Sequence, residues 1–131
     1  MMSRGEQGMG FSQTTTTHHF LLKPNSGIIA VSANDKKDVL TREHIRTHLA
    51  HIAHAFAVGD FDIPMFVHGQ TPPGVPAMKR LAKEIHYDSH NTEDGGEVII
   101  SSSSPEAIRA IHDFLAFQIR DHKTGDPTTV P

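Results

Sequence analysis

The 131-residue chain has no cysteine, no tryptophan and one tyrosine. Without a thiol, disulfides, thiolate zinc sites, iron–sulfur clusters and cysteine nucleophiles are all excluded. The shortage of indole and phenol rings disfavours recognition by aromatic stacking. Any metal ion would therefore have to be bound by histidine, with help from aspartate, glutamate or methionine.

The sequence also lacks basic clusters and long hydrophobic runs. It has 12 Lys and Arg against 15 Asp and Glu, for a formal net charge of -3, and no basic run predicts a nucleic-acid partner. No stretch reaches the roughly 18 apolar residues of a membrane span, and residues 1–17 are polar rather than signal-like. We expect no nucleic acid and no membrane as partner. The sequence as given predicts a cytoplasmic protein, or a periplasmic or secreted one if an export signal has been removed.

Length and hydrophobic content fit one domain with a modest core. The chain is 37% hydrophobic, which is enough for one domain but not for two. Residues 1–16 show no apolar periodicity and predict a flexible N-terminal arm. Residues 17–131 are predicted to form a single α+β domain.

Two pairs of short apolar runs predict β-hairpins. The runs THHFLLK and IIAVSAN flank PNSG, and the runs IHYDSH and EVIISSS flank NTEDGG; both patterns are typical of strands joined by a turn. Alternation in the first run puts His18, Phe20 and Leu22 on one face.

Three segments predict helices. Residues 38–58 carry an apolar stripe, a short helix follows over about residues 76–85, and residues 105–122 begin with a Ser-Pro-Glu start signal. The resulting order is ββααββα. This order predicts an antiparallel sheet of about four strands with three helices packed on one face.

The last predicted helix is apolar on two sides. Ile108, Ile111, Leu115 and Ile119 form one stripe, whereas Phe114 and Phe117 point to the other side. Either the helix is sandwiched within the fold, or its second face meets another chain. The simplest version of the second alternative is a homodimer.

Histidine is unusually frequent, with 11 residues in the chain against one tyrosine and no tryptophan. Four of them fall in EHIRTHLAHIAHAF, where helical spacing puts His48 nearest the buried edge and His54 toward solvent. His44 and His48 are spaced i, i+4, and His48 and His51 are spaced i, i+3, so neighbouring imidazoles can share an ion. The glutamate of an HExxH zinc protease is missing. The alternative is that these histidines are simply solvated boundary residues.

A wider set of histidines would form a metal site if they converge in the fold. The likeliest ligands are His48, His112 and His122, with His18 or His68 completing the shell and His44, His51 and Met65 as additional candidates. Imidazole favours copper or zinc, and a thioether favours copper. Three histidines would leave an open position for a metalloenzyme, and four would close the site. Asp113 and Asp121 are candidate acceptors for the ligands' second nitrogens.

Two metal-free alternatives stay open, and no catalytic residue is assigned. In the first, a histidine acts as general acid or base with Asp60 or Asp62, although no nucleophile motif accompanies it. In the second, the protein is a binding or structural module, dimeric and pH-responsive, because its histidines would charge between about pH 7 and pH 5.

Several segments, spanning nearly the whole chain, resemble a group of small, mostly uncharacterised and often exported bacterial proteins. They are TTHHF, IRTHLAHIAHAFAVGDF, HG with a following PPGV, AIHDFLAFQIRDH and TGDP. Some proteins of that group carry the label aspartate carbamoyltransferase, but this chain has no Ser-Thr-Arg-Thr phosphate loop and is too short for the two domains of that enzyme. The resemblance implies that five histidines match the group's pattern: His18, His48, His68, His112 and His122. It places His44, His51 and His54 in the more variable spacing.

Overall fold

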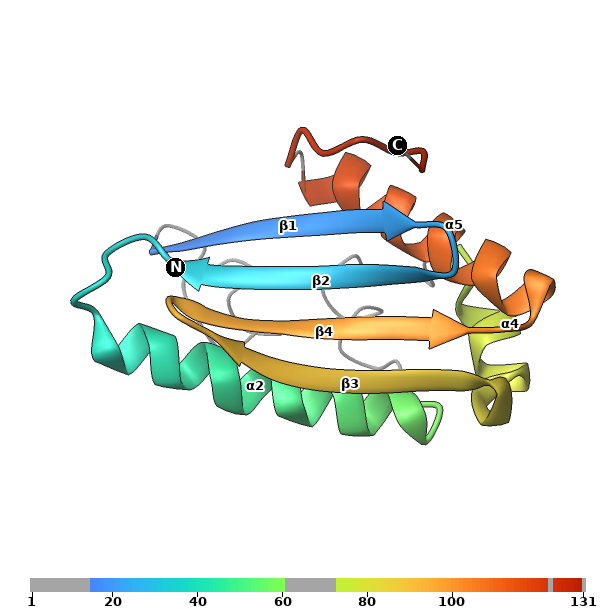
Figure 1. The fold of residues 1–131 in the computed structure, drawn as a ribbon, viewed down its shortest axis with the longest axis horizontal. Coiled ribbons are helices and arrows are strands. Elements are labelled where there is room, and N and C mark those ends of the chain that lie inside the picture. Colours follow the sequence, from blue (N-terminus) through green and yellow to red (C-terminus); the bar gives the residue numbers. More distant parts are fainter. Residues whose placement is uncertain (1–14, 61–72, 123, 131) are drawn as a thin grey trace.

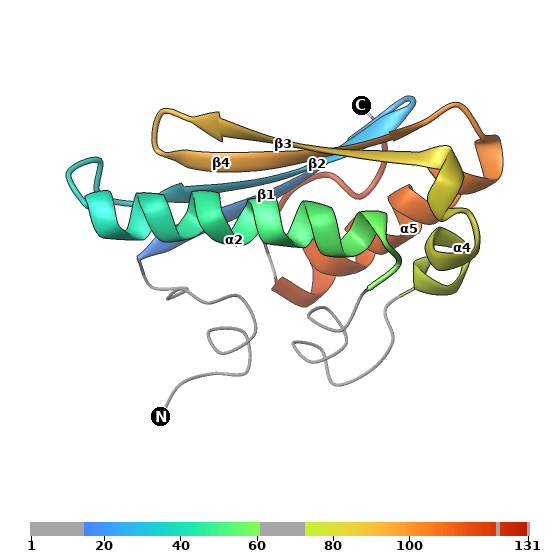
Figure 2. The ribbon, with the colours of Figure 1, turned by 90° about the horizontal axis from the view of Figure 1, so that it is seen from below.

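The computed structural model describes residues 15–60, 73–122 and 124–130 of the protein. The described part is a four-stranded antiparallel sheet with helices on one face and an open second face (Figures 1 and 2). Among the described residues, the order of strands and α-helices is ββααββα. The predicted α+β class and the placement of the helices on one face are confirmed.

The strands form two hairpins, β1 (Thr16–Lys23) with β2 (Ser26–Ala33), and β3 (Ile85–Thr92) with β4 (Gly95–Ser102). Their order across the sheet is β1-β2-β4-β3, so β2 and β4 are central and β1 and β3 are edges. Both hairpins are confirmed, but the second turn is tighter than NTEDGG predicts. Strand β3 continues through Thr92 and β4 starts at Gly95, so the turn consists of Glu93 and Asp94.

Tertiary contacts explain why Gly95 belongs to a strand and not to the turn. A Cβ atom on Gly95 would lie 2.1 Å from the carbonyl oxygen of Val31, so only glycine fits there. The Arg46 side chain holds the same turn, since Nε donates to the Gly95 oxygen at 3.0 Å and Nη2 donates to the Thr92 oxygen at 2.7 Å. None of these contacts is visible in the local sequence.

Helix α2 (Val39–Ala57) begins and ends as the sequence predicts. Asp38 is its N-cap and accepts hydrogen bonds from the Thr41 hydroxyl at 2.6 Å and the Thr41 amide at 3.1 Å. Both bonds lower the pKa of the Asp38 carboxyl, and the bond from the hydroxyl has the larger effect. Gly59 follows the helix with a φ of 82°, a left-handed conformation that stops it.

The helix predicted over about residues 76–85 is shorter and divided. Helix α4 spans Val75–Arg80, and a 3-10 helix, η1 (Ala82–Glu84), leads into β3. Gly74 precedes α4 with a φ of 84°, and a Cβ atom there would lie 2.3 Å from the carbonyl oxygen of Ala110 in the last helix. Close packing between two helices therefore sets where α4 starts.

The core lies between the covered face of the sheet and the helices. Phe20 and Leu22 of β1 are buried on that face, as the alternation predicts. The predicted stripe of α2 is buried along its full length and consists of Ile45, Leu49, Ile52 and Phe56. Each such large side chain typically contributes about 2–5 kcal/mol to stability.

Helix α5 (Pro105–His122) is sandwiched within the fold, which was one of the two alternatives. Ile111 and Leu115 face the sheet, where Gly27 leaves room for them. On the other side the Phe114 ring packs edge-on against Phe56, with centroids 5.9 Å apart. None of the helices in the described ranges is both long and apolar enough to cross a bilayer.

Candidate functional site

The four histidines of α2 differ in exposure as the helical spacing predicts. His44, His51 and His54 are exposed, whereas His48 is half-buried beside the core residue Leu49. The predictions that His48 lies nearest the core and that His54 faces solvent are confirmed.

A hollow of about 440 Å³ lies along this helix, lined by His44, Thr47, His48 and His51. The rings of His48 and His51 have centroids 6.3 Å apart and planes inclined by 33°. Helix neighbours at i, i+3 and i, i+4 have Cβ atoms about 5–6 Å apart. Side-chain rotation can therefore bring two ring nitrogens within the roughly 2.0–2.1 Å of a shared ion. We call these four residues the α2 histidine face.

His18 lies on the covered face of β1 and is half-buried. It pairs with Val31, which pairs with Gly96. Helix α2 crosses this row, because a Cβ atom on Gly96 would lie 3.2 Å from Leu49 Cδ1. His18 and His48 therefore lie at the same level along the strands.

His48 also lies on the flank of α2 that faces away from β3. The preceding Arg46 reaches the β3–β4 turn on the opposite flank. Two residues later the helix has rotated by about 200°, so His48 is directed toward the β1 side. Two of the predicted ligands, His18 and His48, thus share one side and one end of the molecule.

The α2 histidine face is open. Within residues 15–60, 73–122 and 124–130, no three histidine, aspartate or glutamate side chains are grouped closely enough to hold a metal ion. The predicted ligands His68 and Met65 lie outside the described residues, as do the side chains of His122 and Asp121. A metal bound here would have water in its remaining positions.

His112 lies elsewhere and has a structural contact. Its Nε2 is 2.7 Å from the carbonyl oxygen of Lys23 and 3.3 Å from that of Ser26. A ring nitrogen between two carbonyls carries the hydrogen and donates it. His112 thus joins α5 to the β1–β2 turn, roughly 16 Å along the strand from His18. The structure does not bring His112 together with His18 and His48.

Asp113, the predicted acceptor beside His112, also points elsewhere. It lines a hollow of about 360 Å³ between α4 and α5, together with Glu106 and Arg109. The Nε2 atom of His112 is bonded to backbone oxygens instead. Carboxylate support for a metal-bound His112 is therefore not built into this part of the fold.

A histidine–carboxylate pair that sequence reasoning missed joins β1 to the C-terminal segment. His19 Nδ1 lies 3.0 Å from Asp126 Oδ1, and Asp126 Oδ2 accepts hydrogen bonds from the Phe20 amide at 3.0 Å and the Thr124 hydroxyl at 2.7 Å. The Phe20 amide belongs to the edge of β1 that pairs with no other strand of the described sheet. Residues 124–126 are therefore a strap that covers a sheet edge. The only sequence signal was the Thr-Gly-Asp-Pro turn.

The contacts of Asp126 shift its ionisation. Burial alone would raise the pKa of this carboxyl, but the hydrogen bonds from Thr124, Phe20 and His19, with the charge of His19, lower it below its usual value. The pair has the form of an acid–base dyad. The neighbouring hollow, lined partly by Leu21 and Pro127, holds only about 60 Å³, which is small for a substrate.

Of the two carboxylates predicted for acid–base catalysis, Asp60 belongs to the described residues. Asp60 is exposed after the end of α2, and its amide donates to the Ala55 oxygen at 2.8 Å. Asp62 lies outside the described residues. The acid–base alternative stays a prediction.

Comparisons with protein-family models, with curated protein sequences and with solved structures found no match. The resemblance to a group of bacterial proteins therefore stays a prediction.

Proposed function

We propose that this protein binds a divalent transition metal ion, copper or zinc, at the α2 histidine face. The observation that carries the proposal is a single hollow lined by three imidazoles, those of His44, His48 and His51. His48 is the central ligand because it is spaced i, i+4 from His44 and i, i+3 from His51. His18, at the same level on β1, is the candidate for an additional ligand.

The donor set determines which ions are favoured. Imidazole nitrogens suit copper, zinc and nickel, and the general affinity order places Cu²⁺ above Zn²⁺. Two or three imidazoles leave coordination positions for water, which is typical of an exchangeable or reactive ion rather than a purely structural one. Binding is the proposed function; no reaction is assigned.

The charges on α2 favour a cation at this face. Arg46 lies on the opposite flank and is bonded to Glu43 at 3.2 Å and to the β3–β4 turn. Arg42 also lies beside Glu43, with Nε 3.7 Å from its carboxylate. Neither arginine lines the hollow, so repulsion of a divalent ion is small.

The direct test is calorimetric titration of untagged protein with Cu²⁺ and with Zn²⁺ at neutral pH. We expect one principal site, tighter for Cu²⁺, and a dissociation constant raised about tenfold or more in His48→Ala, since even indirect losses at metal sites reach this size. The matched control is His54→Ala, another exposed histidine of the same helix outside the hollow. Equal affinities in the two variants would contradict the assignment.

A spectroscopic measurement identifies the ligands independently. Electron paramagnetic resonance of the Cu²⁺ complex reports the nitrogens bound to the ion. We expect fewer coordinated nitrogens in His44→Ala or His51→Ala than in the wild type. A loss in His18→Ala would add β1 to the site, and an unchanged spectrum in all three variants would exclude the α2 histidine face.

A further inference from the structure

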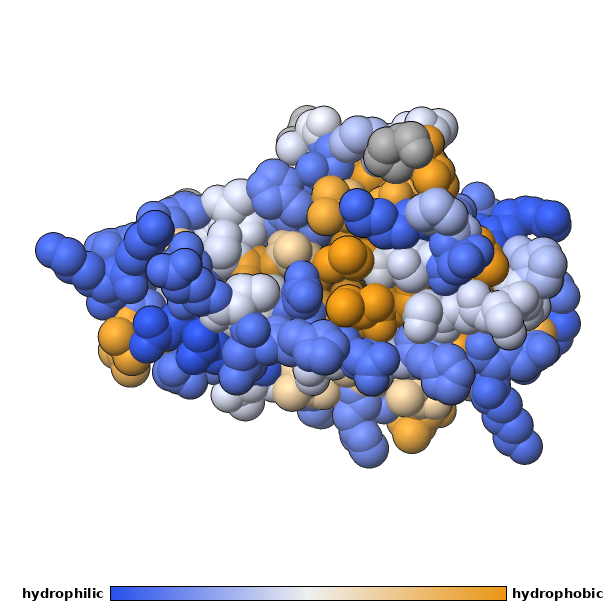
Figure 3. All heavy atoms as spheres, viewed as in Figure 1, coloured by the Kyte–Doolittle hydropathy of each residue, from blue (hydrophilic) through white to orange (hydrophobic). Residues whose placement is uncertain are grey.

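The open face of the sheet has an apolar centre. Leu21, Ile28 and Ile99 face away from the helices and pair in one row across β1, β2 and β4. All three are only half-buried, as is Ala30 beside them. Figure 3 shows the resulting apolar patch on the face turned toward the viewer. An antiparallel sheet with one face in water normally carries polar residues at such central positions.

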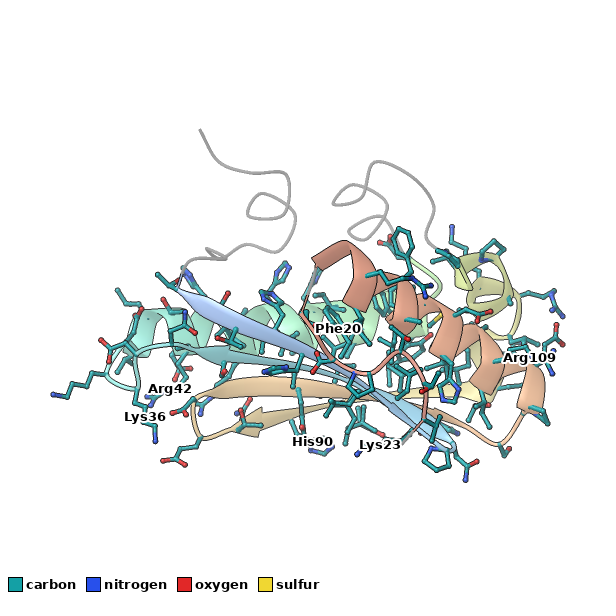
Figure 4. All side chains as sticks on the ribbon, turned by 90° about the horizontal axis from the view of Figure 1, so that it is seen from above. Phe20, Lys23, Lys36, Arg42, His90 and Arg109 are labelled. Carbon is teal, nitrogen blue, oxygen red and sulfur yellow. The ribbon has the colours of Figure 1, made fainter. Side chains whose placement is uncertain are left out.

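Charged and titratable side chains frame this patch. Lys23 and His19 lie outward on β1, at one side of the apolar row. On the other side the row ends at Asp88 of β3, and the next row pairs Glu97 with His90. Figure 4 shows Phe20 directed toward the helices and His90 directed away from them, on the open face. Lys23 and the Asp126-bound His19 thus flank the patch along β1, and Asp88 and Glu97 flank it on β3 and β4.

We propose that this open face is the interface of a homodimer, with the two sheets packed face to face about a two-fold axis that runs along the strands. This axis lays β1 of one copy on β3 of the other. It therefore places Ile28 of each copy on Ile99 of the second copy, and Leu21 opposite the second copy's Asp88. Lys23, two residues further along β1, is then within reach of that carboxylate. A two-fold interface requires such self-complementarity.

The size of the face fits this occupant. Four strands about 4.8 Å apart and eight residues of about 3.3 Å each cover roughly 500 Å² per copy. Two copies bury about 1,000 Å², which is the lower limit for a specific interface. We therefore expect a moderately stable dimer. Association through the edge of β1 is disfavoured, because the Phe20 amide on that edge already donates its hydrogen bond to Asp126.

The first test is sedimentation analysis of the full chain over a range of concentrations. We expect a dimer that dissociates on dilution, and a monomer throughout for Ile99→Lys, which puts a charge at the centre of the patch. The control is Ala50→Lys, which adds the same charge at an exposed position of α2 and should stay dimeric. Circular dichroism checks that both variants fold. A wild-type monomer at all concentrations overturns the proposal.

The second test fixes the orientation and uses the absence of cysteine in the natural chain. Leu21→Cys and Asp88→Cys proteins are mixed and oxidised. The proposed axis predicts a mixed disulfide between them, whereas Lys36→Cys, at an exposed site off the sheet face, should not cross-link with either. A dimer that forms no mixed disulfide would overturn the proposed packing.

Discussion

At the scale of single residues, three described histidines have three different surroundings. His112 donates to two backbone oxygens, His19 pairs with a carboxylate, and His48 lies half-buried in a row of imidazoles. The roles differ because the surroundings differ: two carbonyl oxygens of a turn, a carboxylate, and a helix boundary. Residue type alone therefore does not identify a metal ligand.

Replacing His112 by alanine separates its structural contact from metal binding. We expect His112→Ala to lower the free energy of unfolding by about 1 kcal/mol, because two carbonyls lose their donor. Its Cu²⁺ affinity should stay that of the wild type. Urea unfolding and calorimetric titration measure the two effects. Loss of affinity without loss of stability would instead return His112 to the metal site.

The Asp126 strap predicts a dependence of stability on pH. The folded-state pKa of Asp126 lies below its ordinary value of 3.8, so the strap stabilises the fold fully above that value and is lost as the pH falls through the lowered pKa. At pH 7 we expect Asp126→Asn to reduce stability by about 1 kcal/mol, since His19 is half-exposed and solvent screens the pair.

Urea unfolding at a series of pH values, with hydrogen exchange at the Phe20 amide, tests this expectation. The difference between wild type and Asp126→Asn should shrink toward strongly acidic pH. A difference that stays constant with pH would show that the charge of Asp126 is not what holds the strap.

Tyr87 provides a test in the core. Its ring packs against Phe56 at 6.0 Å, burial raises the pKa of its hydroxyl, and among the described residues this hydroxyl has no hydrogen-bond partner. Removing a buried, unsatisfied polar group relieves a desolvation cost. Tyr87→Phe should therefore leave thermal stability unchanged or raise it by about 1 kcal/mol. A clear loss of stability would reveal a partner for the hydroxyl.

At the scale of elements, packing between neighbouring helices and strands determines how closely their backbones approach one another. Helices α4 and α5 meet at Gly74, whose missing side chain lets it approach the Ala110 oxygen. The hairpin β3–β4 is held by Arg46 of α2. Contacts between elements, and not only local propensity, therefore decide where α4 and β4 begin.

Two glycines with almost the same φ separate conformational strain from steric contact. Gly74 and Gly59 have φ angles of 84° and 82°, but at Gly59 no described residue lies within 4 Å of an added Cβ atom. We expect Gly59→Ala to cost about 1 kcal/mol from conformation alone, and Gly74→Ala to cost about 2 kcal/mol or more. Chemical denaturation measures both, and equal losses would show that the α4–α5 contact adjusts without cost.

At the scale of the whole molecule, the two proposed surfaces lie on opposite sides of the structure. The α2 histidine face belongs to the helical side, and the apolar patch belongs to the open face of the sheet (Figure 2). Metal binding and self-association should therefore be energetically independent, because no residue contributes to both surfaces.

This independence is measurable. Saturation with Cu²⁺ to about 100 times the dissociation constant should stabilise the wild type by about 2.7 kcal/mol. The same gain is expected in Ile99→Lys, whereas at the same Cu²⁺ concentration it should fall to about 1.4 kcal/mol or less in His48→Ala, whose dissociation constant is about tenfold higher or more. Thermal unfolding with and without the metal tests this, and loss of the gain in Ile99→Lys would mean that the two surfaces are coupled.

The sequence by itself determined the features that depend on neighbouring residues. Alternation and helical spacing predicted both hairpins, the long helices and the position of His48 at the edge of the core, because each depends on a period of a few residues. The row of imidazoles on α2 was predictable for the same reason. Only the tertiary structure decided what His112 and Asp126 contact and why Gly95 is part of a strand. Their partners lie far along the chain, 107 positions away for His19 and Asp126. A local sequence pattern does not predict which distant segment packs beside them.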